Sequence, residues 1–386
     1  MQFGIRKSGE ASLQRPIVPA SEVQAKASIQ HKLRAQVRPA TRLATVSVVI
    51  PCYNYARYLP EAVNSALSQA GVVVDVIVVD DGSSDNSLEV ARQLAAANPR
   101  ITVIAHEINY GAVKTFNDGL AVAEGEYLVR LDADDLLTPG SLLRSVAVMQ
   151  RFPSVGLVYG HPIHFTDPLR KAHRDQPTSW TVWPGRDWLE TRCRTGTNVI
   201  TSPEVLMRRA VVDIVGGQMP LAHTHDMEMW LRMAAFCDVA YIKGADQAWH
   251  REHPKSLSAM EVDPLRDVME RRDAFETLFS GIAGQIPQAD AFCGKARLAV
   301  ASGAVKLAIN RYDCGYLDAS EIAKLREIAT AMVADVKALP DWRSLERRMV
   351  LGAKGTRRDL RCIIERVARG ISGRYSRWKW HRTGEW

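Results

Sequence analysis

Short runs of β-branched and aliphatic residues alternate with helical patterns through the first half of this 386-residue chain. The apolar runs are 46–51, 72–80, 101–106, 126–132, 155–160 and 239–242. Helical periodicity is found at 58–69, 86–97, 113–123, after Pro139 and at 226–236. Near-continuous apolar runs are typical of strands buried on both faces, and strands that alternate with helices favour a right-handed parallel arrangement. We therefore predict an α/β domain with a mostly parallel sheet flanked by helices.

The texture of the sequence changes at several points and predicts four parts. Residues 1–45 are polar, basic and aperiodic, which predicts a flexible segment. Residues 46–262 carry the α/β pattern, which loosens after 150 into a second half, 151–262, rich in His, Pro, Thr and Trp. Long Ala, Leu, Arg and Glu patterns predict a helical extension over 263–342. Residues 343–386 form a basic tail that contains tryptophans.

The formal net charge of +7 is unevenly distributed along the chain. Residues 1–46 carry +6 and residues 343–386 carry +9, which leaves the region between them at −8. The positive charge is thus confined to the two ends, and no nucleic-acid-binding motif accompanies it. We do not expect nucleic acid to be a partner.

Cysteine usage and hydropathy indicate the compartment. No apolar stretch reaches the roughly 18–20 residues that a membrane-spanning helix needs, and the N-terminus does not resemble a secretory signal. The six cysteines are scattered without a C-x-x-C pair, which suits reduced thiols better than disulfides or a zinc cage. They are Cys52, Cys193, Cys237, Cys293, Cys314 and Cys362. A cytoplasmic protein is predicted.

Polar residues follow each predicted strand of the first half. They are Pro51, Tyr53 and Asn54 after the first strand, Asp80 and Asp81 at the second, Asn109 and Gly111 after the third, and Asp132, Asp134 and Asp135 after the fourth. Open parallel sheets bind ligands at the carboxyl ends of their strands, so we expect these groups along one edge. For Ser83 and Asp85, in the "GSSD" segment, simple capping of the next helix remains an equal alternative.

The segment "VRLDADDLL", residues 129–137, places three carboxylates in four positions. Side chains alternate along an extended segment, so Asp132 and Asp134 point the same way with Ala133 between them. Two convergent carboxylates at an exposed edge are typical of a Mg²⁺ or Mn²⁺ site that stays open to substrate phosphates. Asp135 faces away and is assigned to the turn.

Three segments together resemble the nucleotide-sugar-binding half of the family 2 glycosyltransferases, which are inverting enzymes with the GT-A fold. They are "VSVVIPCYN", "VIVVDDGSSDNS" and "NYGAVKTFNDGLAVAEGEYLVRLDADD", and the resemblance extends over 46–258. It implies a GT-A-type, Rossmann-like sheet. It also implies that Tyr53 stacks on the nucleotide base, that Asp81 binds the base with Asp80 beside it, and that Asp132 lies near ribose and metal. Asp134 corresponds to the metal ligand that holds the donor diphosphate.

The second half resembles the same family less tightly. "HTHDMEMWLRMA" is similar to the family segment whose Asp is the catalytic base, which implies this role for Asp226. His225 stands where the family usually has Glu. "WHREHPKSLS" resembles a later segment in which a His approaches the metal or diphosphate, here His253, and "NVITSPEVLMRR" (198–209) resembles the segment that leads to the acceptor. Phe116 stands where many members have Arg, and Lys114 is the alternative source of positive charge.

The resemblance implies metal-dependent transfer of a sugar from a nucleotide sugar, UDP-linked by expectation, to an acceptor hydroxyl. The expected donor site comprises Pro51, Tyr53, Asn54, Asp80, Asp81, Lys114, Asp132 and Ala133, with Asp134, Asp132 and His253 around Mn²⁺ or Mg²⁺. Two alternatives stay open: a nucleotidyltransferase on a similar fold, and a non-catalytic sugar-nucleotide-binding scaffold. The first generally needs a Gly-rich basic loop, which "PCYNYARYLPE" lacks. Retention of both Asp134 and Asp226 argues against the second. For Asp226 a purely structural role as a helix N-cap also stays open.

The basic tail has two interpretations. Arginines interleaved with Trp378, Trp380 and Trp386 are compatible with a segment that rests on an anionic leaflet, where lipid-linked acceptors lie, at the inner face of the plasma membrane. A solvated, partly helical tail is the alternative. The acceptor is expected to be a saccharide or a lipid-linked molecule, and a cell-envelope polysaccharide pathway is what the resemblance makes common.

Overall fold

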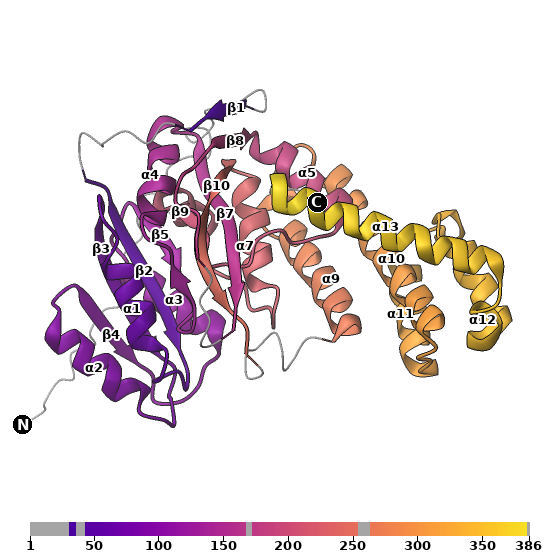
Figure 1. Ribbon diagram of the computed structural model, residues 1–386, viewed down its shortest axis with the longest axis horizontal. Coiled ribbons are helices and arrows are strands. Elements are labelled where there is room, and N and C mark those ends of the chain that lie inside the picture. Colours follow the sequence, from indigo (N-terminus) through magenta and orange to yellow (C-terminus); the bar gives the residue numbers. More distant parts are fainter. Residues whose placement is uncertain (1–30, 36–42, 167–171, 254–262, 384–386) are drawn as a thin grey trace, which may run out of the picture.

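A ten-stranded sheet runs through the molecule between two layers of helices (Figure 1). The computed structural model describes residues 31–35, 43–166, 172–253 and 263–383. Its strands are β1 (His31–Arg34), β2 (Thr45–Cys52), β3 (Val73–Asp80), β4 (Ile101–Ala105), β5 (Tyr127–Arg130), β6 (Leu136–Leu137), β7 (Val155–Phe165), β8 (Ser179–Trp183), β9 (Leu206–Arg208) and β10 (Asp238–Arg251).

The described α-helices fall into those that cover the sheet and those that extend beyond it. The former are α1 (Leu59–Leu67), α2 (Ser87–Ala97), α3 (Ala112–Val122), α4 (Ser141–Arg151), α5 (Gly185–Thr195), α6 (Arg209–Val215) and α7 (His225–Ala234). The latter are α9 (Pro264–Ser280), α10 (Ala289–Cys314), α11 (Ala319–Met332), α12 (Trp342–Thr356) and α13 (Leu360–Thr383), with short 3₁₀ turns at Ile282–Gln285 and Val336–Ala338.

The strand order is β1-β8-β10-β7-β9-β5-β2-β3-β4, with β6 paired to β10. Strands β5, β2, β3 and β4 are parallel, as predicted, and β7 is parallel to β10. Strand β9 joins these two parallel parts by antiparallel pairs on both of its sides. In the register of the first part Val49 lies opposite Ile77 on one side and Arg130 on the other, so the carboxyl ends of β2, β3 and β5 meet at one edge.

Strand residues alternate between two hydrophobic clusters, which explains why the apolar runs are nearly continuous. Val46, Val48 and Ile50 point into the cluster that contains helices α1 and α4. Val49 and Val79 point into the other cluster, with residues of α3, α5 and α7. Both faces of the sheet are thus covered, and the functional groups are restricted to its edges and strand ends.

Helix α3 packs unusually close to the sheet at Gly119. A Cβ added there would lie 2.5 Å from a methyl of Val49 and 2.9 Å from one of Val79. Only glycine allows this approach. The close packing brings the N-terminal turn of α3 to the carboxyl edge, beside the residues that follow β3.

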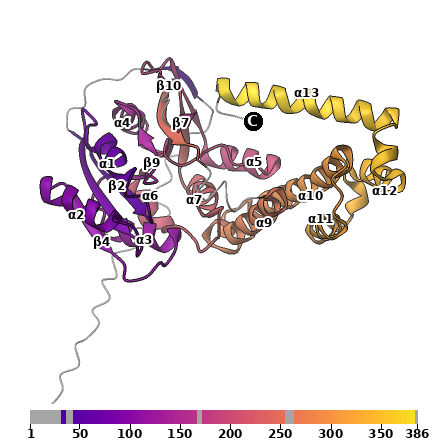
Figure 2. The same ribbon diagram turned by 60° about the horizontal axis from the view of Figure 1, so that its bottom comes forward.

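The helical extension shares its core with one face of the sheet (Figure 2). Helix α9 begins at an Asp263 N-cap, whose carboxylate accepts from the amide of Arg266 at 2.8 Å, followed by Pro264. Phe275 of α9 and Val300 of α10 belong to the same hydrophobic cluster as the α5 and α7 residues. The predicted helices of 263–342 are therefore present, and they pack onto the α/β domain.

The two basic ends differ from a pair of unstructured tails. In the predicted flexible segment 1–45, His31–Arg34 form β1, which pairs with β8, while 1–30 and 36–42 lie outside the described residues. The tail 343–386 contains most of α12 and the 24-residue helix α13, and Trp386 is outside the described residues. Within the described ranges, no helix combines the length and hydropathy needed to cross a bilayer.

Candidate active site

The carboxyl edge of β5 holds a buried ion pair. Arg130, the last residue of β5, donates from its two terminal nitrogens to Asp132, at 2.7 and 3.2 Å. The Arg130 side chain is buried, whereas that of Asp132 is 34% exposed. A bidentate pair of this kind fixes the orientation of the carboxylate. Asp132 therefore faces the edge with one side already neutralised by Arg130.

Asp226 lies near Arg130, in the first turn of α7. The residue that caps this helix is Thr224, so the alternative that Asp226 is only an N-cap is wrong. Burial raises the pKa of Asp226, and the nearby Arg130 guanidinium opposes this rise. The predicted base and the first Asp of the D-x-D segment thus share one arginine as their neighbour.

A strained turn holds Asp226 in place. Ser202 Oγ donates to Asp226 Oδ2 at 2.9 Å, and Ser202 has a φ of 125°. For a residue with a side chain such a conformation costs about 1–3 kcal/mol and needs support from its surroundings. The buried Glu204 gives that support by accepting from the amides of Thr201 at 2.7 Å and Ser202 at 3.2 Å. The hydroxyl of Ser202 is therefore aimed at the carboxylate by the fold.

Asp134 and His253 meet at the same edge. Their Oδ2 and Nε2 atoms lie 2.8 Å apart, and both side chains are nearly buried. The His253 ring stacks on Tyr58 with 5.7 Å between centroids. Burial, together with the charges of Asp135 and Asp132, raises the pKa of Asp134 to about 8. A carboxylate so placed is stabilised in its charged form only when a positive group joins it.

Asp135 has a structural role, but its side chain bonds the end of β10 and not the turn to which the sequence assigned it. Its carboxylate accepts from the amide of Arg251 at 2.8 Å and lies 3.0 Å from Nδ1 of His250. Arg251 in turn donates to the Asp134 carbonyl at 2.7 Å. These contacts attach the loop after β5 to the end of β10 and so bring His253 to Asp134.

Two of the three expected metal ligands, Asp134 and His253, lie together. The third, Asp132, pairs with Arg130 instead. Within the described ranges, no three His, Cys, Asp or Glu side chains converge as a cation site. Asp134 with His253 nevertheless fits a divalent cation, because Mg²⁺-type sites commonly take one or two protein ligands and complete their shell with phosphate oxygens and water. The raised pKa of the crowded carboxylate is the observation that supports this fit.

Asp81 is buried and bonded within the chain. It accepts from the amides of Tyr110 at 2.8 Å and Gly111 at 2.9 Å, and it lies 2.8 Å from Nδ1 of His106. Burial alone would raise the pKa of Asp81, but the hydrogen bonds from His106 and these amides outweigh it, and the pKa is lowered. Asp81 thereby shapes the loop at the start of α3, which borders the predicted base pocket.

His106 extends this contact towards Lys114. Its Nε2 lies 2.9 Å from Asp118, and the same carboxylate accepts from Lys114 Nζ at 2.6 Å. The Lys114 ammonium also lies 5.1 Å from the centre of the Tyr110 ring. The structure thus places Lys114 beside the loop that Asp81 holds, half-exposed at the surface.

The loops after β2 and β3 are joined side by side. The side-chain oxygen of Asn54 accepts from the amide of Ser84 at 2.8 Å, and the amide of Asn54 donates to Ser83 Oγ at 3.0 Å. Asp85 accepts from the amide of Ala56 at 3.2 Å. Asn54, Ser83 and Asp85 therefore join the two loops, beyond the helix capping that the sequence suggested.

The remaining predicted donor residues occupy different environments. The Tyr53 ring is exposed beside the joined loops, and Pro51 is half-buried opposite Val79 in the ladder. Asp80 is buried and accepts from the amide of Ser83, while its Oδ1 has no hydrogen-bond partner. Ala133 is buried in a hydrophobic cluster, so only its backbone can border a ligand.

The two departures from the family pattern are both buried. Burial, with the positive charge of Arg130 and His223, lowers the pKa of His225 to about 3, so its imidazole is neutral. Phe116 packs in the hydrophobic cluster beneath α3 and contributes no charge. Neither residue replaces the charged side chain that the family usually has there.

Three participants were missed in the sequence. Arg130 had a visible signal, since a charged residue inside a buried strand requires a partner. Ser202 and His106 had none, because their partners lie 24 and 25 residues away along the chain.

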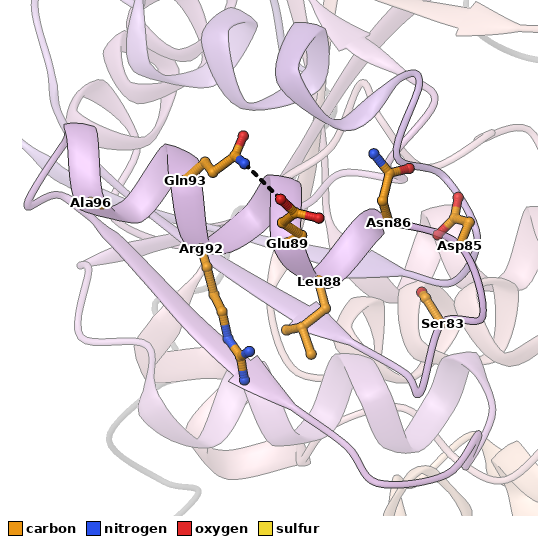
Figure 3. A pocket seen from close by; sticks show the side chains of 8 residues that line it. All are labelled: Ser83, Asp85, Asn86, Leu88, Glu89, Arg92, Gln93 and Ala96. Atoms are coloured by element: carbon orange, nitrogen blue, oxygen red, sulfur yellow. Dashed lines mark hydrogen bonds between the residues drawn. The ribbon is translucent and has the colours of Figure 1, made fainter.

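A surface hollow beside α2 does not belong to this site. Figure 3 shows the side chains that line it, among them Glu89, which accepts from Gln93 at 3.1 Å. Its lining is Ser83, Asp85, Asn86, Leu88, Glu89, Arg92, Gln93 and Ala96. None of the carboxylates Asp132, Asp134 and Asp226 takes part, so this hollow is not the candidate site.

Comparison with known protein families identifies the domain. Residues 47–214 match the model of Glycosyl transferase family 2. This domain belongs to glycosyl transferase family 2. The family 2 match begins within β2, includes β3 to β5, the aspartates after these strands and the Ser202 turn, and ends within α6, so it does not include α7 and Asp226.

The chain matches only part of the length of its curated relatives. The chain is 43% identical over 114 residues to an uncharacterized glycosyltransferase from Nostoc sp., which is 30% of this chain and 35% of that protein. It is 40% identical over 101 residues to a chondroitin synthase from Pasteurella multocida, which is 26% of this chain and 10% of that protein. The chain thus corresponds to about a third or less of these two relatives.

Two solved structures are loosely similar. One is the mannosyltransferase PcManGT from Pyrobaculum calidifontis in complex with GDP-Man and Mn²⁺, with 18% identity, a TM-score of 0.49, and coverage of 88% of this chain and 92% of that one. The other is S. aureus TarS in complex with UDP-GlcNAc, with 18% identity, a TM-score of 0.44, and coverage of 74% and 91%.

Proposed function

We propose that the chain is an inverting glycosyltransferase that moves a sugar from a nucleotide-sugar donor, UDP-linked, to an acceptor hydroxyl. The observation that carries the proposal is the arrangement around Arg130. It lies against Asp132 of the D-x-D segment and near Asp226 of α7, 94 positions later in the chain. A donor-side carboxylate and a half-buried base are thereby brought to one edge, as a single displacement requires.

Asp226 is the proposed general base. It takes the proton of the acceptor hydroxyl as that oxygen attacks the anomeric carbon and the bond to the donor diphosphate breaks. The raised pKa suits this task, because a base is most effective when its pKa approaches the working pH. Ser202 donates to Oδ2 of the carboxylate and the amide of Met227 donates to Oδ1 at 2.6 Å, so both oxygens are held in a fixed orientation. One displacement with one base inverts the anomeric configuration.

Asp134 and His253 are the proposed ligands of Mn²⁺ or Mg²⁺, with Asp132 on the ribose side. Such an ion, when bound, supplies positive charge to the departing diphosphate. Asp134 holds the position at which that charge is needed. The Tyr53 ring is exposed on the loop after β2 and is the proposed platform for the nucleotide base.

The acceptor is proposed to be a saccharide or a lipid-linked molecule, bound beside 161–220. Asn198 begins the segment that ends in the Ser202 turn, and its side-chain oxygen accepts from the amide of Ile200 at 3.1 Å. The turn that positions the base is therefore continuous with the proposed acceptor region. A role in cell-envelope polysaccharide synthesis at the inner face of the plasma membrane would follow from such an acceptor.

The test is transfer by the purified full chain. The protein is incubated with Mn²⁺, a panel of nucleotide sugars and a panel of saccharide and lipid-linked acceptors, and nucleoside diphosphate release is measured. Release that depends on acceptor and metal, and is lost in Asp226→Asn, supports the proposal. If no nucleoside diphosphate is released with any donor–acceptor pair, at donor concentrations that saturate the protein, the proposal is contradicted.

The two alternatives are distinguished by parallel measurements with other substrates. A nucleotidyltransferase would release pyrophosphate from a nucleoside triphosphate and a sugar phosphate. A non-catalytic binding protein would bind donor, measured by calorimetry, and release nothing under any condition. Asp134→Ala serves in each case as the matched variant with impaired diphosphate binding.

A further inference from the structure

Helix α13 carries a continuous apolar stripe on its exposed side. Its members are Leu360, Ile364, Val367, Ile371, Tyr375 and Trp378, each between 54% and 75% exposed. Their spacing of three and four residues confines them to an arc of about 80° on a helix with 100° per residue. We call these six residues the outer stripe; it is about 27 Å long at 1.5 Å per residue.

The opposite side of α13 is attached to the protein at both ends. Near its start, Glu365 pairs with the buried Arg348 of α12 at 2.7 Å, and Arg369 pairs with Asp313 of α10. Near its end, Trp380 Nε1 donates to the carbonyl of Val199 at 3.3 Å. Figures 1 and 2 both show α13 extending from α12 back towards the α/β domain. The outer stripe is therefore held outward by contacts on the other face.

Basic residues border the outer stripe on its two sides. Arg361 lies on one side and Arg374 and Arg377 on the other, and all three are exposed. In the whole helix, seven Lys and Arg accompany one acid, a net charge of +6. An apolar face edged with arginines is the pattern of helices that lie in the plane of a membrane surface.

We propose that the outer stripe docks the protein on an anionic lipid surface. The apolar side chains enter the boundary between headgroups and acyl chains, and the arginines contact the anionic headgroups. This is an interaction surface separate from the proposed catalytic edge, and it would place the enzyme beside membrane-bound acceptors.

Charge complementarity favours an anionic lipid surface over two other occupants of the outer stripe, a second copy of α13 and residues 1–46 of this chain. A second copy of α13 would bring +6 against +6, and the basic residues 1–46 would bring another +6. Either partner would place like charges together at the edges of the stripe, which opposes binding. An anionic bilayer supplies the apolar phase and the opposite charge at once.

The experiment measures sedimentation of the full chain with vesicles of phosphatidylcholine, with and without phosphatidylglycerol, and needs neither donor nor acceptor. We expect binding to the anionic vesicles that weakens as salt is added. Ile371→Glu should reduce the partition about tenfold or more, since it removes one inserted apolar side chain and adds a negative charge. Leu298→Glu, at an exposed position of α10, is the matched control and should bind like the wild type.

Three outcomes would overturn the proposal. The first is absence of pelleting with anionic vesicles, and the second is equal pelleting of the wild type and Ile371→Glu. The third is a dimer, seen by analytical ultracentrifugation without vesicles, that Ile371→Glu dissociates, since a second copy would then cover the stripe. Arg374→Gln with Arg377→Gln should reduce binding to anionic vesicles only. Because sugar transfer is not measured, a protein that binds lipid but lacks transferase activity remains a distinguishable result.

Discussion

Nε2 of His253 and Oδ2 of Asp134 lie 2.8 Å apart although 119 residues separate them in the chain. The loop after β5 and the end of β10 are brought together by Asp135, which bonds Arg251 and His250 from the same loop. The side chains of His253 and Asp134 are thus brought together by the contacts of Asp135, which is not itself a proposed site residue. Asp134 and His253 would provide a divalent cation with a carboxylate ligand and an imidazole ligand.

His253→Ala is expected to raise the Mn²⁺ concentration that gives half-maximal transfer. Loss of groups around a metal commonly costs affinity by about 10–100-fold, and we expect the lower end of this range because Asp134 remains. The measurement is a Mn²⁺ titration of nucleoside diphosphate release at saturating donor. Thr330→Ala, which removes a hydroxyl that bonds carbonyls of its own helix, α11, is the control. An unchanged Mn²⁺ midpoint in His253→Ala would exclude His253 as a ligand.

Asp226→Asn should reduce turnover by about 100- to 10,000-fold while donor binding is preserved. The amide cannot take the acceptor proton, which is the contribution expected of a general base. Ser202 can still donate to the amide oxygen, so the turn should keep its conformation. Turnover is measured at saturating donor and acceptor, and donor affinity by calorimetry. Normal turnover in this variant would refute the assignment of the base.

The acid limb of the pH profile of kcat/KM should move to higher pH in Ser202→Ala. A base works when deprotonated, so activity falls as the pH drops through its pKa. Burial already raises the pKa of Asp226, and the Ser202 hydrogen bond is one of the contacts that lower it. A hydrogen bond to a charged group contributes about 1.5 kcal/mol, which corresponds to about one pKa unit. Loss of this bond should therefore move the acid limb of the kcat/KM profile about one unit to higher pH.

The groups that face Asp226 define the control for this pH prediction. Arg130 of β5 and His223 before α7 both lower the pKa of Asp226 and are left unchanged in Ser202→Ala. Thr330→Ala removes a hydroxyl that only bonds carbonyls of its own helix, α11, and should leave the profile unaltered. A Ser202→Ala profile that falls in height at every pH without a shift would mean that Ser202 acts on geometry alone.

Asp313→Asn should destabilise the C-terminal helices. Asp313 is buried, lies 2.9 Å from Nε of the fully buried Arg348, and also pairs with Arg369 of α13. Arg348 keeps Glu365 as its remaining carboxylate partner, so we expect the loss of one hydrogen-bonded charge to cost about 1.5–3 kcal/mol. The free energy of unfolding is measured by urea titration, and hydrogen exchange over 360–383 reports whether α13 detaches. Glu327→Gln, at an exposed position of α11, is the control and should change neither quantity.

Local pattern was sufficient for β2 to β5 and α1 to α4 of the α/β domain, but it did not predict β8, β9, α5 or α6. The apolar runs of β2, β3 and β5 lie on both faces of the sheet, so nearly every residue had to be apolar, and this is visible without any partner. The polar residues at the strand ends followed from the same pattern, because a run ends where burial ends. The position of Asp226 at the start of a helix was likewise readable from the periodicity of α7.

Contacts between distant segments decided how those residues are used. The D-x-D pattern places Asp132 and Asp134 on the same side of the segment, yet one pairs with Arg130 and the other with His253. Asp81, which the sequence predicts beside the nucleotide base, accepts from the amides of Tyr110 and Gly111, and this contact was not visible in the sequence. These choices depend on which loops the sheet register brings together, and no local pattern encodes that register.

The tail illustrates the division most clearly. Composition alone identified a basic segment with tryptophans, and periodicity alone could not tell which side of the helix is covered. The contacts of Glu365, Arg369 and Trp380 settle this, because they turn one face of α13 inward and leave the outer stripe exposed. Sequence determined the elements because burial acts residue by residue. The tertiary structure determined the site and the stripe because both depend on partners far away along the chain.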